Sequence, residues 1–167
     1  MIVVVVDDLA FLQVDAVLRP ATDRLDPVAS VSSRLDQIAG PRFAAERRVQ
    51  SPLEVGSAVV TSSGDLAAPF VVHVVIRSEE TNPTRDAIRR ALTSAWQRAS
   101  AWGLNVVAAP SVGAGAGQLG LAEAAELMAR TFIDHQRTAD APAELRIVVD
   151  REEDRELVEA AVRGVEA

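Results

Sequence analysis

The chain has 167 residues, a length typical of one domain, and its core must be aliphatic because only four Phe, two Trp and no Tyr are present. Its formal charge of −7 at pH 7 excludes a general nucleic-acid binder, which needs a cationic face toward the phosphates. The lack of cysteine excludes disulfides, a thiolate nucleophile and a Cys-based zinc site. The two histidines, His73 and His135, show no metal-ligand spacing, so we expect no metal and no cofactor.

The chain opens with a run of β-branched residues over 2–6 that stops at Asp7 and Asp8. Such an unbroken run predicts a strand that is covered on both faces. In a doubly covered sheet, ligands bind beyond the carboxyl ends of the strands, so the two aspartates stand where a ligand-facing loop is expected. The run is too short for a membrane span or a signal sequence, and we therefore expect a cytoplasmic protein without membrane contact.

Two further elements and a basic connection are predicted before residue 50. A strand is predicted over 16–18, and Pro20 is expected to stop its pairing because proline lacks an N–H donor. Apolar residues then recur at steps of three and four, which predicts a helix over 27–39 that ends at Gly40. The charged residues that follow are expected to form a solvated connection: Arg42, Glu46, Arg47 and Arg48.

Strand and helix patterns alternate through the rest of the chain. Asn82 and Pro83 are expected to begin a helix that ends near Trp102, and Trp96 lies within its apolar stripe, which favours a core position. No linker or repeat divides the chain, so 1–167 is predicted to be a single three-layer α/β domain. The other predicted strands cover 57–61, 70–76, 106–109 and 145–149, and the other predicted helices cover 121–135 and 152–162.

A glycine-rich turn connects the strand at 106–109 to the helix that begins at Leu121. It consists of Ser111, Val112, Gly113, Ala114, Gly115, Ala116 and Gly117. A strand, a turn almost without side chains and a helix start allow backbone N–H groups to approach an anion, so the pattern is typical of a phosphate-binding loop. The same residues are also compatible with a tight connection that binds nothing.

Few side chains could catalyse a reaction. His73 lies in the middle of a predicted strand, where a hydrogen-bonded structural role is expected, and His135 near a helix end is expected to be exposed. No base stands in a recognisable pattern beside Ser62 or Ser63. The acidic segment 150–154 is expected to begin the last helix. The residues therefore favour a binding protein over an enzyme and identify no catalytic group.

Four stretches together resemble the macro domain, a family that binds ADP-ribose and in some branches hydrolyses ADP-ribose esters or glycosidic linkages. They occur in the family's order between residues 2 and 135. The resemblance implies a three-layer α/β/α fold with a mixed, mostly parallel central sheet. The stretches are 8–10 with 14–17, the frame Leu25, Val31, Leu35 and Ala39-Gly40, the hairpin 56–61 through Leu66 to 70–73, and 110–115.

The resemblance also implies roles for single residues. In the family, the residue that matches Asp8 accepts a hydrogen bond from the adenine amino group, and the backbone N–H of its neighbour, here Leu9, contacts a ring nitrogen. The glycine-rich turn over 111–117 matches the family's second phosphate loop. From the residues alone, Asp8 could instead end the strand or cap a local turn.

Two segments depart from the family's pattern. The family's Asn-Ala-Ala-Asn is 19–22 here, so the second Asn, which holds the ribose in hydrolysing branches, is replaced by Thr22 with a single hydroxyl. The family's Gly-Gly-Gly is 28–30 here, where side chains block close backbone approach to a pyrophosphate. Arg19 could bind a phosphate with its guanidinium or point to solvent. The candidate contacts that remain in the second segment are Ala29, Ser30 and the following Val31.

These matches and departures predict a divergent macro-like domain that binds ADP-ribose or a related adenine nucleotide through Asp8 and 113–117, with little or no hydrolysis. One alternative is a macro-fold scaffold or assembly protein whose ligand site has degenerated, with Val28 or Arg19 in the phosphate path. The other is a hydrolase of an ADP-ribose ester or a nucleotide phosphate, in which Thr22 and a bound water would act. The sequence makes no prediction of the oligomeric state.

Overall fold

The computed structural model describes residues 1–28, 30–115 and 118–167. Within these ranges, six strands form one sheet in the order β1-β6-β5-β2-β4-β3. All strands run parallel except β3, which lies at one edge and pairs antiparallel with β4. The strands are β1 (Ile2–Val6), β2 (Ala16–Thr22), β3 (Ala58–Ser62), β4 (Phe70–Arg77), β5 (Val106–Ala109) and β6 (Glu144–Val149).

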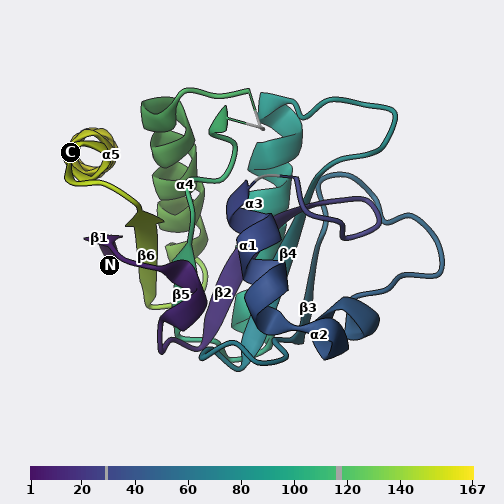
Figure 1. Ribbon diagram of the computed structural model, residues 1–167. Coiled ribbons are helices and arrows are strands. Elements are labelled where there is room, and N and C mark those ends of the chain that lie inside the picture. The colour runs from purple at the N-terminus through teal and green to yellow at the C-terminus, as the bar shows by residue number, and fades with distance from the viewer. Residues whose placement is uncertain (29, 116–117) are drawn as a thin grey trace.

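Helices cover both faces of this sheet (Figure 1). One face packs against α3 (Arg85–Ala101), α4 (Leu121–Gln136) and α5 (Glu152–Glu166). The other face packs against the 3-10 helix η1 (Leu9–Phe11), α1 (Ser30–Ala39) and α2 (Pro41–Glu46). This arrangement confirms the predicted three-layer α/β/α fold with a mixed, mostly parallel sheet. None of the helices in the described ranges has an apolar stretch long enough to cross a bilayer.

The central strands are apolar without interruption because both of their faces are buried. In β4, Val71 lies in the cluster under α1 and α2, whereas Val72 lies in the larger cluster under α3, α4 and α5. Val17 and Leu18 of β2 divide between the two clusters in the same way. Successive side chains of a strand point to opposite faces, so each strand contributes to both cores. Trp96 is fully buried in the larger core, as predicted, and its indole N–H donates to Thr131 Oγ1 at 3.0 Å.

β1 packs on both faces, as its sequence predicts, because Ile2 and Val4 contact the larger core and Val5 contacts the smaller one. It lies at the edge of the sheet, where it pairs only with β6. Val4 is its single buried residue, and Val6 is 39% exposed. The burial of β1 is less complete than an unbroken apolar run suggests, because such a run does not report that the strand lies at the edge of the sheet.

Pro20 does not end β2, which continues through Thr22 beside β4. The pairing of β2 with β5 stops at Val17, so the second half of β2 has a partner strand on one side only. The carbonyl of Pro20 accepts a hydrogen bond from the hydroxyl of Ser32 at 3.0 Å instead of joining a ladder there. A missing N–H donor is tolerated at such a position, which is why the strand continues.

Two helix starts differ from their predicted positions. α1 begins at Ser30, three residues later than predicted, because Pro27 forms an isolated bridge with Ala21. α3 is capped by Thr84, whose hydroxyl accepts a hydrogen bond from the N–H of Ala87 at 3.1 Å, and not by Asn82. Two short helices, η1 and α2, were not predicted, and α2 occupies part of the segment that was expected to be a connection; the other strands and helices lie where the periodicity predicts them, within a few residues at their ends.

Candidate functional site

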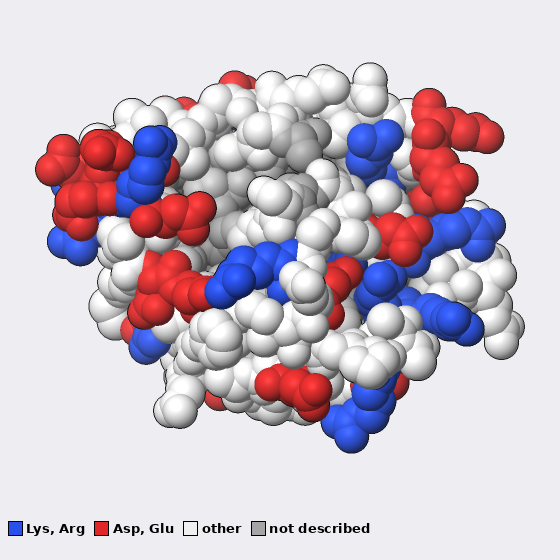
Figure 2. Space-filling view, viewed as in Figure 1, with Lys and Arg blue, Asp and Glu red and all other residues white. Residues whose placement is uncertain are grey.

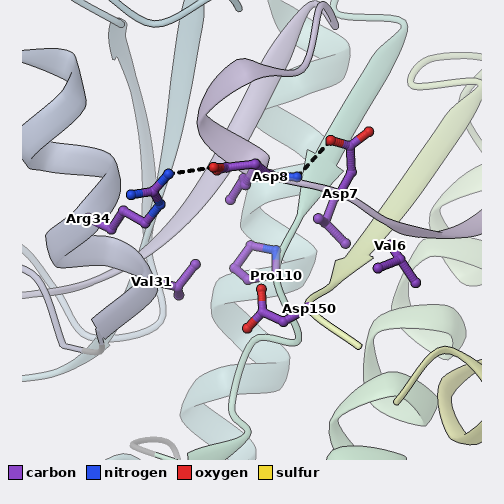
Figure 3. A pocket seen from close by; sticks show the side chains of 9 residues that line it. Val6, Asp7, Asp8, Val31, Arg34, Pro110 and Asp150 are labelled. Atoms are coloured by element: carbon purple, nitrogen blue, oxygen red, sulfur yellow. Dashed lines mark hydrogen bonds and ion pairs between the residues drawn. The ribbon is translucent and has the colours of Figure 1, made fainter. Parts of the chain in front are cut away.

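A cavity of about 240 Å³ lies beyond the carboxyl ends of the parallel strands, where a doubly covered sheet places its ligands (Figure 3). A second cavity of about 170 Å³ adjoins it and shares four lining residues, Val31, Pro110, Val148 and Asp150. We call the two cavities together the groove. The first cavity is also lined by Val6, Asp7, Asp8, Leu9 and Arg34, and the second by Ser111, Leu121, Val149 and Asp154.

Asp8 lies in the wall of the groove and keeps both carboxylate oxygens engaged. Its Oδ1 accepts a hydrogen bond from the N–H of Ala10 at 3.2 Å and so caps η1. Its Oδ2 lies 2.5 Å from a guanidinium nitrogen of Arg34 (Figure 3). The hydrogen bond from Arg34 lowers the pKa of Asp8 below its ordinary value, so this carboxylate is ionised at neutral pH. The structure therefore shows the local cap, and it also places Asp8 and Leu9 together at the groove.

Arg34 is a groove residue that the sequence did not reveal. It lies on α1 one turn after Val31, and the three-residue spacing places both side chains on the helix face that borders the first cavity. Among the described residues that line the groove, it is the sole cation. Its spacing from Val31 was readable, but its pairing with Asp8, 26 residues earlier, was not.

The glycine-rich turn reaches the groove through Ser111. Gly113 has a φ of +99°, and a Cβ added there would lie 2.9 Å from a methyl group of Leu119, so the fold itself requires this glycine. Gly115 also has a positive φ, +66°, but a Cβ there would meet no described atom within 4 Å. Val112 is buried and packs in the core. The turn thus combines a tight connection at Gly113 with an open stretch at Gly115.

The structure describes some of the other residues that were predicted to contact a ligand from the turn and from α1. Ala114 is half-buried, and its N–H donates to the carbonyl of Ser111 at 3.1 Å. Ser30 is exposed at the first position of α1, and Val31 lines both cavities. Val28 packs against the larger core cluster rather than filling the groove. The remaining predicted contacts, Ala29, Ala116 and Gly117, lie outside the described residues.

Thr22 lies at the end of β2 and lines neither cavity of the groove. Its hydroxyl oxygen accepts hydrogen bonds from the N–H groups of Asp26 at 3.1 Å and Arg24 at 3.3 Å. These bonds close the turn that leads from β2 toward α1. A ligand role for Thr22 stays a prediction, whereas its hydroxyl has a structural role in this turn.

Arg19 does not point to solvent, so that alternative was wrong, and it lines neither cavity of the groove. It is fully buried, and its guanidinium binds both carboxylate oxygens of Asp36 on α1 at 2.6 Å each. A third contact joins it to Nδ1 of His73 at 3.2 Å, and its guanidinium carbon lies 5.9 Å from the centre of the Phe43 ring. Burial lowers the pKa of Arg19, and the hydrogen bonds to Asp36 oppose that shift.

Arg47 extends this buried cluster toward the turn after β2. Its guanidinium donates to the carbonyl of Leu25 at 2.9 Å and lies 3.2 Å from Asp26 and 3.5 Å from Asp36. The side chain of Arg47 is 15% exposed, so the prediction of a solvated connection was wrong for this residue. Arg42, in contrast, is exposed as predicted and pairs with Glu46.

His73 has the hydrogen-bonded structural role that its strand position predicts. It is fully buried on β4, and because Arg19 can only donate, Nδ1 must accept and Nε2 must carry the proton. Nε2 then donates to Thr61 Oγ1 at 2.8 Å, and that hydroxyl donates to the carbonyl of Ser62. Burial, followed by the charges of Arg19 and Arg47, holds the pKa of His73 well below its ordinary value. His73 is therefore neutral and cannot serve the groove as an acid.

His135 is half-buried rather than exposed, because its Nε2 lies 2.9 Å from the carbonyl of Ala141 in the loop before β6. Within the described ranges, no group of three or more His, Cys, Asp or Glu side chains is arranged to hold a metal ion.

Comparison with known proteins identifies similarity to one protein family. The macro domain family model matches residues 19–128. An O-acetyl-ADP-ribose deacetylase of Cronobacter sakazakii is 31% identical over 160 residues, which are 90% of this chain and 87% of that protein. An uncharacterized protein of Mycobacterium tuberculosis is 32% identical over 130 residues, 77% of this chain, which spans only 36% of the length of that relative.

Solved structures give the same fold. A Trypanosoma brucei macrodomain in complex with ADP-ribose is similar with a TM-score of 0.84 at 20% identity, over 96% of this chain and 68% of that chain. An Oceanobacillus iheyensis macrodomain with ADP is similar with a TM-score of 0.78 at 20% identity, over 98% and 90% of the two chains.

Proposed function

The chain belongs to the macro domain family, and on that premise we propose that its groove binds ADP-ribose or a related adenine nucleotide. The observation that carries the proposal is the continuity of the groove. Asp8 and Leu9, from the connection after β1, and Ser111, from the turn after β5, line adjoining cavities with four shared residues. A base and a phosphate of one nucleotide would need such a pair of neighbouring subsites. The relatives crystallised with ADP-ribose and with ADP add support.

In the proposed mode, the carboxylate of Asp8 accepts a hydrogen bond from the adenine amino group. Each carboxylate oxygen has two lone pairs, so Asp8 can accept this bond while it still caps η1. The phosphates lie along 111–115, where backbone N–H groups and the bare surface at Gly115 allow close approach. Arg34 stands beside Asp8 and supplies the one positive charge among the described groove residues.

We further propose that the groove binds its ligand with little or no hydrolysis. The hydroxyl of Thr22 is engaged by two backbone N–H groups, and it offers one donor where an asparagine amide would offer two and an acceptor. The neutral, buried His73 is unavailable as a general acid or base. The name of the Cronobacter relative motivates the opposing hypothesis of a deacetylase.

Titration calorimetry with ADP-ribose, ADP and AMP tests the binding proposal. We expect heat for all three ligands, and its absence at millimolar concentration for each of them would contradict the proposal. Asp8→Asn keeps an oxygen acceptor for Ala10 but places amide donors toward the ligand, so it should weaken adenine binding. Asp140→Asn, at an exposed carboxylate that lines neither cavity, is the matched control.

Incubation with O-acetyl-ADP-ribose tests the proposed lack of hydrolysis. We expect acetate release at the rate of a protein-free blank. Faster release that Thr22→Val abolishes would show that the chain is a hydrolase and that Thr22 takes part.

A further inference from the structure

Among the residues that the structure describes, no strand pairs with the outer side of the β1 backbone. The carbonyl of Met1 accepts from Leu145 at 2.9 Å, and the N–H of Asp7 donates to Val149 at 3.3 Å, so the odd-numbered positions of this strand face β6. Because backbone groups alternate in direction along a strand, the N–H and C=O groups of Ile2, Val4 and Val6 face away from the sheet. We call this side the free edge. Figure 1 shows β1 as the outermost strand at that end of the sheet.

The free edge lacks the features that natural proteins use to protect such strands. Edge strands are usually interrupted by Lys, Pro or a bulge, because an exposed apolar edge pairs with other strands. β1 contains only Ile and Val, and its register with β6 is continuous from Ile2 to Val6. β3, at the opposite edge, carries Thr61 and Ser62, whose hydroxyls are both hydrogen-bonded.

A cavity of about 260 Å³ borders the free edge. Its floor is formed by Ile2, Val3 and Val4 of β1, and its rim is formed by α5. The rim residues are Glu159, Val162, Arg163 and Glu166. An added strand would therefore find an apolar floor for its alternate side chains and charged groups for the others.

The surroundings of the free edge are acidic. α5 carries six acidic residues, Glu152, Glu153, Asp154, Glu156, Glu159 and Glu166, against the two basic residues Arg155 and Arg163. Figure 2 shows acidic side chains outnumbering basic ones over α5 at the left of the molecule. At the other end of the strand, Asp7, Asp8 and Asp150 add further carboxylates. A second copy of a chain with charge −7 would place a like-charged helix beside α5, which disfavours pairing between two copies.

We propose that the free edge of β1 binds an extended, basic segment of a partner protein by strand addition. The segment forms backbone hydrogen bonds with Ile2, Val4 and Val6. Its apolar side chains enter the cavity beside α5, and its Lys or Arg side chains pair with Glu166 at the rim and share Glu159 with Arg155 and Arg163, which lie 3.2 Å and 4.0 Å from it. This surface lies on the side of β1 that faces away from β6. The proposal does not depend on what the groove binds.

A nine-residue peptide of alternating valine and lysine, fluorescently labelled, tests the proposal with the whole chain. We expect its anisotropy to rise on addition of the protein, and we expect a matched valine–glutamate peptide to give no rise. Amide hydrogen exchange followed by NMR gives the second readout. The lysine peptide should slow exchange at Val4 and Val6 and leave Val3 and Val5 unchanged, because those amides already bond to β6.

Ile2→Pro removes one free-edge donor at the first residue of the strand, where proline is tolerated. Loss of one hydrogen bond should weaken the lysine peptide about two- to tenfold. Ile2→Val, which keeps the donor, should bind as the wild type does. Three results would each overturn the proposal: no binding at millimolar peptide, equal binding of the glutamate peptide, or slowed exchange at odd and even positions alike. Sedimentation that showed a dimer with Val4 and Val6 protected would assign the free edge to a second copy instead.

Discussion

Two charged regions of the molecule differ in how accessible their side chains are: the connection after β1, which contains Asp8, and the cluster of Arg19, Asp36 and Arg47 between β2 and α1. After β1, Asp8 keeps its side chain 38% exposed in the wall of the groove, where a ligand can reach it. In contrast, Arg19 of β2 is fully buried and Arg47, which follows α2, is 15% exposed, and both lie beside the carboxylate of Asp36. The first region therefore keeps polar groups available for binding, whereas the second uses them to fix α1 against the sheet.

The largest effect on stability is expected when one partner of the buried pair Arg19–Asp36 is removed. Arg19→Met removes the two short hydrogen bonds to Asp36, whose side chain is 12% exposed and keeps only the longer contact with Arg47 at 3.5 Å, and it removes the donor to Nδ1 of His73. Breaking a buried pair by removing one partner costs about 3–5 kcal/mol, so the free energy of unfolding should fall by about that much in urea denaturation.

The double variant Arg19→Met with Asp36→Leu is the matched control for that loss. Replacing both partners also removes the carboxylate of Asp36, which has lost its main partner in the single variant, and most of the stability should return. A double variant as unstable as Arg19→Met alone would show that shape, and not charge, carries the stabilisation.

Asp8→Asn should lower the affinity for ADP-ribose and leave the free energy of unfolding almost unchanged. Arg19→Met should do the reverse. The amide oxygen can still accept the cap bond from Ala10, but the charged acceptor for the adenine amino group is lost. A hydrogen bond to a charged group contributes about 1.5–3 kcal/mol, so ADP-ribose affinity should fall about 10- to 100-fold by calorimetry. An unchanged affinity would remove Asp8 from the adenine subsite while leaving binding elsewhere in the groove intact.

Both regions also show which features the sequence could predict and which it could not. Strands and long helices were predictable because the apolar spacing of β4 or α3 depends only on which faces are buried. The edge position of β1 was not, because the spacing does not report the number of neighbouring strands. The partners of Arg19 were not predictable either, since Asp36 and His73 lie 17 and 54 residues away and meet it only in the folded chain.

His73 should make the stability of the β2 side depend on pH below neutrality. In the unfolded chain its imidazole titrates near its ordinary pKa of 6.5, whereas burial holds the folded pKa well below that value. Between the two pKa values the unfolded state binds more protons, so the contribution is constant above about pH 6.5 and is lost as the pH falls below it, by at most about 1.4 kcal/mol per pH unit.

Urea denaturation at pH 7.5 and 5.5, compared between wild type and His73→Gln, isolates this contribution from the carboxylates. The wild type should lose more stability than His73→Gln over that interval. Equal losses would mean that the buried imidazole accepts its proton without opposition from Arg19 and Arg47.

The smallest effect on stability is expected for Arg34→Gln. The effect of this variant on adenosine binding distinguishes two roles for Arg34. Its ion pair with Asp8 is exposed on both sides, so Arg34→Gln should change the free energy of unfolding by only about 0.2–1 kcal/mol. Adenosine, which has no phosphate, then reports on the base subsite alone. If Arg34 competes with adenine for Oδ2 of Asp8, Arg34→Gln should bind adenosine severalfold more tightly, and added salt should strengthen wild-type binding because it screens the pair. Weaker adenosine binding by Arg34→Gln would instead place the guanidinium in contact with the base, and Asp8 would then serve to hold Arg34 in position.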